Sequence, residues 1–496
     1  MQLTDLKVLS ENEILTIHEN SLVILESVGL RVESKKILDL LQKKSCIVNF
    51  ENERVKFPPS IVEECLSTLP SQIPIFKRDG DLAFILGDGG RYCVSGHNAV
   101  FVLVNETGER RNSTVKDVEN FAILSDKLSE VDMVGVPVMP QDVTPQTTLL
   151  YAIQAILENS KKPIFFSSES EIINQAVIDM GKVITGKEKL KGCSPMISQL
   201  STTSPLYWER GAVEALYIVA QEGIPLDLLP QPIAGVTAPY TLAGLLTVHN
   251  TEVLSGIIIS QLIHPGTPVI YGAAWTTYEM KQANVLIGRP ESSLLRIAGA
   301  QMAHYYNIPS HTTAPDNDAN SHDEQAAWEK MLSTLAGIIG ANDMIVNLGM
   351  FGTGMTISLE QLVMDNEMCR IAKRFRQGIE VNKDTLALDS ILQVGPRGEY
   401  LTSEHTLHHL RSGEHVPLDV SNGTNFEVWK QKGSKNTTEK SSDLVSSILL
   451  GGCQNPLSQD KQKAIQSIIN QYEKKLGLRY IALFKLTINL KKERKL

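Results

Sequence analysis

Polar and aromatic side chains recur directly after short apolar runs, and these positions are the best suited in the sequence to bind a small ligand. Few of them carry a charge, and several offer a ring face, which suits a small cation better than a phosphorylated molecule. Aromatic residues at strand ends also serve as core plugs, so both interpretations stay open. The predicted ligand-binding residues are Tyr92, His97, Asn98, Gln231, Tyr271, Trp275, Tyr278, His311, Phe351 and Gly352.

The stretch from Asp343 to Gly354 combines a strand signal with a turn signal. An apolar run, Met344 to Leu348, leads into glycines at positions 349, 352 and 354. Glycine permits a sharp turn or the close approach of a ligand, so the pattern predicts a buried strand that ends in an open turn. Phe351 lies among these glycines and is either a core residue of a strand-end loop or part of a pocket floor.

The predicted strand ends lack several familiar catalytic patterns. They contain no carboxylate pair with acid/base spacing, no serine nucleophile elbow and no phosphate-binding loop. Histidines 304, 311 and 322 form one group with aspartates 316, 318 and 323, and histidines 405, 408 and 409 form another. Neither group has a known zinc spacing, so we predict no intrinsic metal and interpret the second group as a polar helix surface. A metal-dependent lyase or hydrolase that uses the first group is an alternative.

Composition restricts the class of protein. The chain of 496 residues is 42% hydrophobic and carries a net charge of −9, which is ordinary for a folded soluble protein and argues against a nucleic-acid partner. Its start lacks the pattern of a signal peptide, and no window reaches the roughly 18 apolar residues of a membrane helix. The six cysteines are scattered without a Cys-x-x-Cys, as in a reducing compartment. We therefore predict a cytoplasmic protein without a membrane partner.

After Thr114, seven short apolar runs alternate with longer amphipathic stretches. This alternation predicts a parallel sheet with helical crossovers, and seven or eight such units close most simply into a (β/α)8 TIM barrel of the α/β class. A doubly wound open sheet is the alternative, which the lack of a Gly-x-Gly-x-x-Gly after a strand disfavours. The predicted strands are Met133–Met139, Pro163–Ser167, Met196–Leu200, Leu226–Ile233, Pro268–Tyr271, Ile308–Thr312 and Met344–Leu348, with an eighth at Asp389–Val394.

The same pattern divides the chain into three parts. Residues 1–115 are predicted as an α+β extension of helices and β-hairpins, residues 116–400 as the barrel, and residues 401–496 as a C-terminal helical extension with a tail. The strands of such a barrel end at one mouth, where active sites form. The predicted ligand-binding residues should therefore gather at that mouth.

Between residues 90 and 410 the sequence resembles the trimethylamine methyltransferase family of corrinoid-dependent methyltransferases. The resemblance implies a (β/α)8 barrel, in agreement with the strand–helix alternation. Its most specific runs are Gln231–Gly244, Gln261–Gly272, Asp318–Glu329, Ser358–Asp365 and Val394–Leu407.

Members of this family that demethylate trimethylamine carry pyrrolysine, and this sequence contains none. The Gly-Met-hydrophobic context aligns the pyrrolysine position with Gly352. The resemblance therefore implies the branch without pyrrolysine, whose substrates are quaternary amines, glycine betaine being the best-known case. A quaternary nitrogen leaves as a neutral amine, here dimethylglycine, so the protein need only orient and desolvate the substrate. Ring faces would hold the trimethylammonium head, and its carboxylate would bind a donor such as His97, Asn98, Gln231 or His311.

The resemblance further implies a methyltransferase that passes the methyl group to the Co(I) corrinoid of a partner protein docked over the mouth. Such chemistry belongs to one-carbon metabolism of the kind seen in methanogenesis. Proline betaine, carnitine and γ-butyrobetaine are alternative substrates, and a non-catalytic betaine-binding barrel is an alternative from another class. Barrels of this size often self-associate, so we also expect a homo-oligomer.

Overall fold

Eight parallel strands close into a barrel in the computed structural model, which describes residues 5–105 and 107–478. Around the barrel they follow one another in chain order, and the last strand pairs with the first. This confirms the predicted fold class and all seven strands predicted from Met133 to Leu348. The barrel strands are β6 (Tyr92–Ser95), β9 (Met133–Gly135), β10 (Ile164–Ser167), β11 (Met196–Leu200), β13 (Leu226–Leu228), β14 (Val269–Ala273), β17 (Ser310–Thr313) and β18 (Met344–Leu348).

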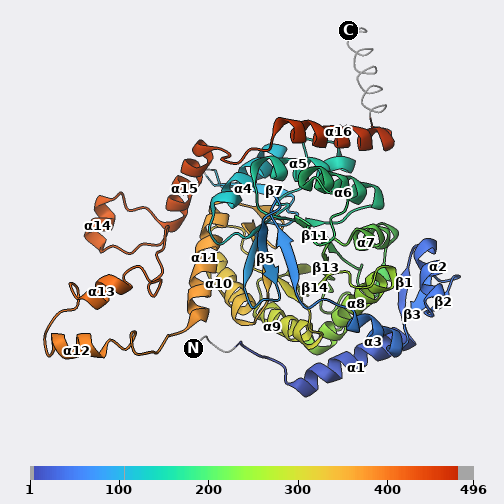
Figure 1. The fold of residues 1–496 in the computed structure, drawn as a ribbon, viewed down its shortest axis with the longest axis horizontal. Coiled ribbons are helices and arrows are strands. Elements are labelled where there is room, and N and C mark those ends of the chain that lie inside the picture. Colours follow the sequence, from blue (N-terminus) through green and yellow to red (C-terminus); the bar gives the residue numbers. More distant parts are fainter. Residues whose placement is uncertain (1–4, 106, 479–496) are drawn as a thin grey trace, which may run out of the picture.

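The predicted eighth strand is wrong. Residues 389–394 belong to helix α12 (Leu388–Val394), which has no buried residue and lies away from the barrel (Figure 1). The barrel is closed instead by β6, which pairs with β18 on one side and β9 on the other. The predicted barrel limits of 116–400 therefore need correction at both ends, because the first strand precedes residue 116 and the last covering helix ends at Gln377.

A ring of helices covers the outer face of the barrel (Figure 1). Local signals set their ends: Thr114 and Asp117 form a capping box at the start of α4, and Gly186 ends α6 in the left-handed conformation that favours glycine. The main hydrophobic core lies between these helices and the strands. The helices are α4 (Val115–Lys127), α5 (Thr148–Asn159), α6 (Glu171–Thr185), α7 (Arg210–Glu222), α8 (Leu242–Ile263), α9 (Pro290–Tyr305), α10 (Glu324–Ile339) and α11 (Leu359–Gln377), with a 3-10 turn at Pro145–Thr147.

Helix α8 is the one helix in the described part of the chain that is long and apolar enough to cross a membrane. Of its most apolar window, 72% is buried inside the fold. It packs against helix α1 (Glu11–Ser27) and helix α3 (Pro59–Ser67). A core helix of a globular protein has these properties.

A β-hairpin closes the amino-terminal end of the barrel. Strands β4 (Ile73–Phe76) and β5 (Leu82–Leu86) pair in antiparallel fashion. Their buried side chains, among them Ile75 and Phe84, form one cluster with barrel-interior residues such as Ile270. The hairpin therefore covers the amino ends of the barrel strands.

The remaining elements attach to the barrel from outside. At the N-terminus, α1, α3 and helix α2 (Lys35–Lys43) accompany a small sheet of β1 (Leu30–Val32), β2 (Ile47–Asn49), β3 (Arg54–Lys56) and β12 (Tyr207–Trp208). Above the carboxyl ends lie β7 (Phe101–Val104), β8 (Glu109–Asn112), β15 (Thr277–Glu279), β16 (Asn284–Leu286), β19 (Met350–Phe351) and β20 (Thr356–Ile357). After α12 come α13 (Glu404–His409), α14 (Phe426–Gln431), α15 (Thr437–Gly451) and α16 (Gln459–Lys475). The tail predicted after this helix falls largely outside the described residues.

Candidate functional site

The alternation of side chains along the strands decides which residues face the barrel interior. Phe165 and Ile270 belong to the interior cluster, so Ser167 and Gly272, two residues further along, face the same side. The ring centroid of Phe165 lies 5.0 Å from that of His97 and 5.5 Å from that of His311. Phe165 thus brings both histidines together at the carboxyl end of the barrel.

A chain of hydrogen bonds crosses the interior from strand to strand. His97 Nε2 lies 3.1 Å from Ser167 Oγ, which donates to Gln199 Oε1. Gln199 Nε2 donates to Ser201 Oγ at 2.6 Å, and that hydroxyl donates to the carbonyl of Leu229. Each side chain is thereby held in one orientation, which a binding site for a small ligand requires.

His311 and Asp227 form a second interior pair, and both side chains are fully buried. His311 Nδ1 lies 3.0 Å from each carboxylate oxygen of Asp227. Because a carboxylate only accepts hydrogen bonds, Nδ1 carries the hydrogen, and the free ring atom is Nε2. Gly272 leaves room for the pair: a Cβ there would lie 2.9 Å from Asp227 Oδ1 and 2.6 Å from the carbonyl oxygen of Leu228.

Burial shifts the pKa values of two groups near the carboxyl ends of the strands, and a neighbouring charge adds to one of these shifts. The pKa of His97 is lowered to about 4, first by burial and then by the nearby His311, so His97 is neutral near pH 7. Glu169 follows strand β10 directly, and burial raises the pKa of its carboxyl group to about 7. Desolvation disfavours the charged form in both cases.

Several buried polar atoms at the carboxyl ends of the strands have no hydrogen-bond partner among residues 5–105 and 107–478. Buried polar atoms normally have partners, so these atoms suit a polar ligand. Donors and acceptors are both present, as a zwitterion would need. They include His97 Nδ1, Asn98 Oδ1, His311 Nε2 and Asn317 Nδ2.

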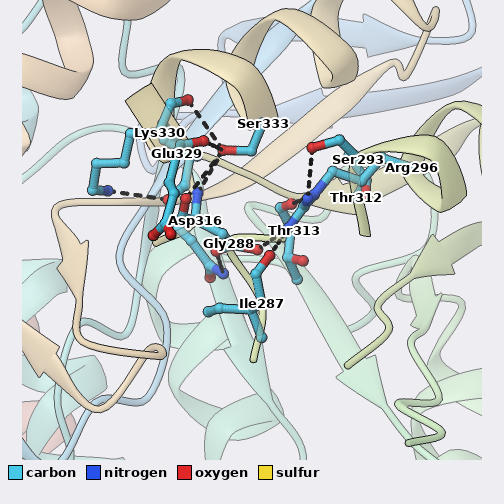
Figure 2. A network of polar contacts seen from close by, with 12 residues as sticks. Ile287, Gly288, Ser293, Arg296, Thr312, Thr313, Asp316, Glu329, Lys330 and Ser333 are labelled. Atoms are coloured by element: carbon cyan, nitrogen blue, oxygen red, sulfur yellow. Dashed lines mark hydrogen bonds and ion pairs between the residues drawn. The ribbon is translucent and has the colours of Figure 1, made fainter. Parts of the chain in front are cut away.

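A polar network fixes the loop after β17 (Figure 2). Arg296 of α9 forms a buried ion pair with Asp316, with Nη2 and Oδ2 2.5 Å apart. Asn347, at a bulge in β18 with φ of 119°, donates to Asp316 Oδ1 at 2.8 Å. Ser333 Oγ accepts from the backbone N–H of Asp316 at 2.9 Å, and Lys330 Nζ donates to the carbonyl of residue 315. The loop that carries Asn317 is therefore rigid.

Three of the predicted ligand-binding residues lie at this interior site: His97, Asn98 and His311. Asn98 follows His97 in the left-handed conformation, with φ of 54°. Three others, Tyr92, Tyr271 and Trp275, lie elsewhere. Tyr92 lies at the opposite end of β6, where its ring stacks on Phe84 of the β4–β5 hairpin at 4.3 Å.

Tyr271 and Trp275 face the helices, so the prediction that their rings line the mouth is wrong. Tyr271 OH donates to Asn250 Oδ1 of α8 at 3.0 Å, and the Trp275 ring packs on His249 at 4.5 Å. The reason is the strand period of two, because Ile270 points inward and Tyr271 must point outward.

Phe351 is covered by residues far away in the sequence. It forms a small cluster with Leu103, Ala319 and Ala326, and its ring lies 4.9 Å from that of His322. This matches the alternative of a core residue in a strand-end loop. Gly352 lies in the turn after it, with φ of 53°.

The last two predicted residues lie in the loops above the mouth. Tyr278 is half-buried in the β15–β16 hairpin, and Gln231 is exposed after β13. Neither is part of the interior hydrogen-bond chain. Both remain predictions as ligand-binding residues.

Sequence reasoning missed Phe165, Ser167, Gln199 and Asp227. One signal was present: Asp227 is a charged residue inside an apolar run, and a carboxylate at such a position needs a buried partner. That partner, His311, is 84 residues away, so the sequence did not identify it.

The first histidine group does not form a common ligand set. His304 pairs with Asp343, His311 with Asp227, and His322 bonds to side chains of α11 and its cap. The metal-dependent lyase or hydrolase predicted from these residues therefore lacks its assembled site.

Comparisons with known proteins find similarity to methyltransferases over nearly the whole chain. The family model "Trimethylamine methyltransferase (MTTB)" matches residues 1–477. Trimethylamine methyltransferase MttB of Desulfitobacterium hafniense DCB-2 is 32% identical over 95% of this chain and 94% of that protein. Glycine betaine methyltransferase of D. hafniense Y51 is 28% identical over 95% of this chain and 98% of its own length.

A solved structure shares the fold. The monomethylamine methyltransferase of Methanosarcina barkeri superposes with a TM-score of 0.50 at 10% sequence identity, over 95% of this chain and 96% of that one. At this identity the likeness concerns the fold alone.

Proposed function

This chain belongs to the trimethylamine methyltransferase family, and from this premise we propose that it demethylates glycine betaine. The methyl group passes to the Co(I) corrinoid of a partner protein, and dimethylglycine is released. The cytoplasm is the proposed compartment, in keeping with six free cysteines. The observation that carries the choice of a quaternary amine is the sequence itself, which contains standard amino acids only.

The leaving group explains why the absence of pyrrolysine matters. In the transfer, a C–N bond breaks and its electron pair stays on nitrogen. A neutral amine such as trimethylamine would leave as an amide anion unless another group first made it cationic. A quaternary nitrogen leaves as a neutral tertiary amine without such help, so ordinary side chains suffice.

The interior site offers groups for both ends of a betaine. In the proposed complex, the His311 ring donates through Nδ1–H to Asp227 and through Nε2–H to the substrate carboxylate in a charge-assisted hydrogen bond. Asn317 Nδ2 is a second free donor. The trimethylammonium head then lies on the outer side, towards Glu169, which follows strand β10 and whose carboxyl pKa is raised by burial to about 7.

This orientation directs a methyl group out of the barrel. His311 is fully buried within a strand, and the β4–β5 hairpin covers the amino end of the barrel, so the proposed direction is towards the loops at the carboxyl ends. The reduced corrinoid supplies the nucleophile from its partner protein. The chain itself contributes orientation and exclusion of water, which are the large effects available to it.

The test supplies the purified chain with a reduced corrinoid protein and one amine at a time. Glycine betaine should methylate the corrinoid and yield equimolar dimethylglycine, measured by the corrinoid spectrum and by mass spectrometry. Carnitine, proline betaine, γ-butyrobetaine and trimethylamine serve as competitors. Turnover of trimethylamine with none of any quaternary amine would contradict the proposal. Betaine binding by calorimetry without transfer would favour a binding barrel instead.

A further inference from the structure

The segment from residue 379 to residue 418 stands off from the barrel and has no core of its own. Figure 1 shows α12 and α13 on long loops beside the body of the protein. Between these limits every side chain is exposed or half-buried. Helices of 7 and 6 residues are too short to be stable alone, since isolated helices below about 12 to 15 residues are marginal in water. Something other than a hydrophobic core must hold this segment.

A cluster of possible metal ligands lies at its centre. His405 and His409 are one helical turn apart on α13, with ring centroids 4.3 Å apart. His409 Nε2 lies 3.1 Å from Asp384 Oδ2, and His405 Nε2 lies 3.1 Å from the carbonyl oxygen of Asp384. One ligand atom from each of these three residues lies within 4.8 Å of the other two. In the described part of the chain this is the one such group of three.

The donor set and its spacing fit zinc. Zinc takes imidazole nitrogen and carboxylate oxygen at about 2.0 to 2.2 Å, so neighbouring ligands of a tetrahedral site lie about 3.3 Å apart. The 3.1 Å between His409 Nε2 and Asp384 Oδ2 is near this value. The sequence predicted no metal because neither histidine group has a known zinc spacing, and Asp384 lies 21 residues before His405.

We propose that Asp384, His405 and His409 bind one Zn²⁺ ion that joins the loop before α12 to helix α13. The metal replaces the missing core as the source of order in this segment, because zinc binding and local folding are coupled. An exposed ion pair alone is a weak substitute. The site lies outside the barrel and is independent of the proposed methyl transfer.

Zinc titration of the full chain, after treatment with a chelator, tests the proposal. Calorimetry and metal analysis should find one zinc ion per chain. His405→Gln and His409→Gln should each weaken zinc binding by at least about tenfold, as loss of even an outer-shell partner does. His408→Gln is the matched control, because His408 is on the same helix but outside the ligand group. It should bind zinc like the unchanged protein.

Hydrogen exchange gives a second readout that does not depend on activity. At a zinc concentration ten times the dissociation constant, amides of residues 380–412 should exchange about tenfold more slowly, in the unchanged protein and in His408→Gln. Equal zinc binding in His409→Gln would overturn the proposal. So would protection of the segment that is complete without zinc and rises with protein concentration, because a second copy would then order it.

Discussion

Substitution of Asp227 by asparagine tests the assignment of the barrel interior. Asparagine keeps the shape of the side chain but removes the charge beside His311 Nδ1, which lies 3.0 Å from both carboxylate oxygens. The His311 ring of the proposed complex then lacks its negative partner at Nδ1, and the hydrogen bond from Nε2–H to the substrate carboxylate is weakened. A charge-assisted hydrogen bond contributes about 1.5 to 3 kcal/mol, which corresponds to a change of about 10- to 150-fold.

The loss should appear as a higher KM for glycine betaine, with kcat changed by less than about threefold, because the carboxylate is held alike in the ground state and the transition state. The assay is steady-state methylation of a reduced corrinoid protein, with betaine affinity measured separately by calorimetry. Unfolding by denaturant would give the accompanying loss of stability, which we expect to be about 1 to 3 kcal/mol.

Asp343→Asn is the matched control. Asp343 is also buried and accepts two hydrogen bonds of 2.8 Å from Ser310, but it lies at the plugged end of the barrel. It should lose similar stability and keep its KM. If both variants raise KM equally, or if Asp227→Asn changes neither KM nor affinity, the proposed role of the pair is refuted.

Three further outcomes are expected. The pKa of buried His249 is lowered from 6.5 to about 3 by burial. The neutral ring therefore contributes its full share of the folding free energy above pH 6.5, and that share falls as the pH drops towards 3. Between pH 7 and 4.5 the unchanged protein should lose about 2 to 3 kcal/mol more unfolding free energy than His249→Asn. Gly272→Ala should lower stability by about 1 to 3 kcal/mol and raise KM, because its Cβ would press on Asp227. In the control Gly211→Ala, the nearest atom lies 3.6 Å from the new Cβ. Thermal unfolding and kinetics should show neither a loss of stability nor a higher KM for this control. Tyr271→Phe should leave KM for betaine unchanged and cost about 1 kcal/mol of stability in denaturant unfolding, because its hydroxyl bonds to helix α8.

Local patterns determined most of the barrel. Apolar runs bounded by turn residues predicted β9, β10, β11, β13, β14, β17 and β18, because strands buried on both faces are mostly apolar; the polar residues within them, such as Asp227 and His311, face the barrel interior. The resemblance of several long runs of sequence added the family, which the comparisons confirm. The sequence predicted His97, after β6, and His311, in β17, as ligand-binding residues from their place at strand ends, and the structure places both in the barrel interior; their role in binding stays a prediction.

Only the tertiary structure decided which strand closes the barrel and which side chains meet inside it. Strand β6 joins β18 across some 250 residues of chain, and nothing in a local pattern names a partner at that distance. Local pattern likewise did not predict that Asp227 pairs with His311, that Phe351 packs against Leu103, or that Tyr271 faces the helices. Hydrophobic periodicity reports how a residue relates to its neighbours in the chain, whereas the register of a closed sheet assigns each side chain to the interior or to the helices.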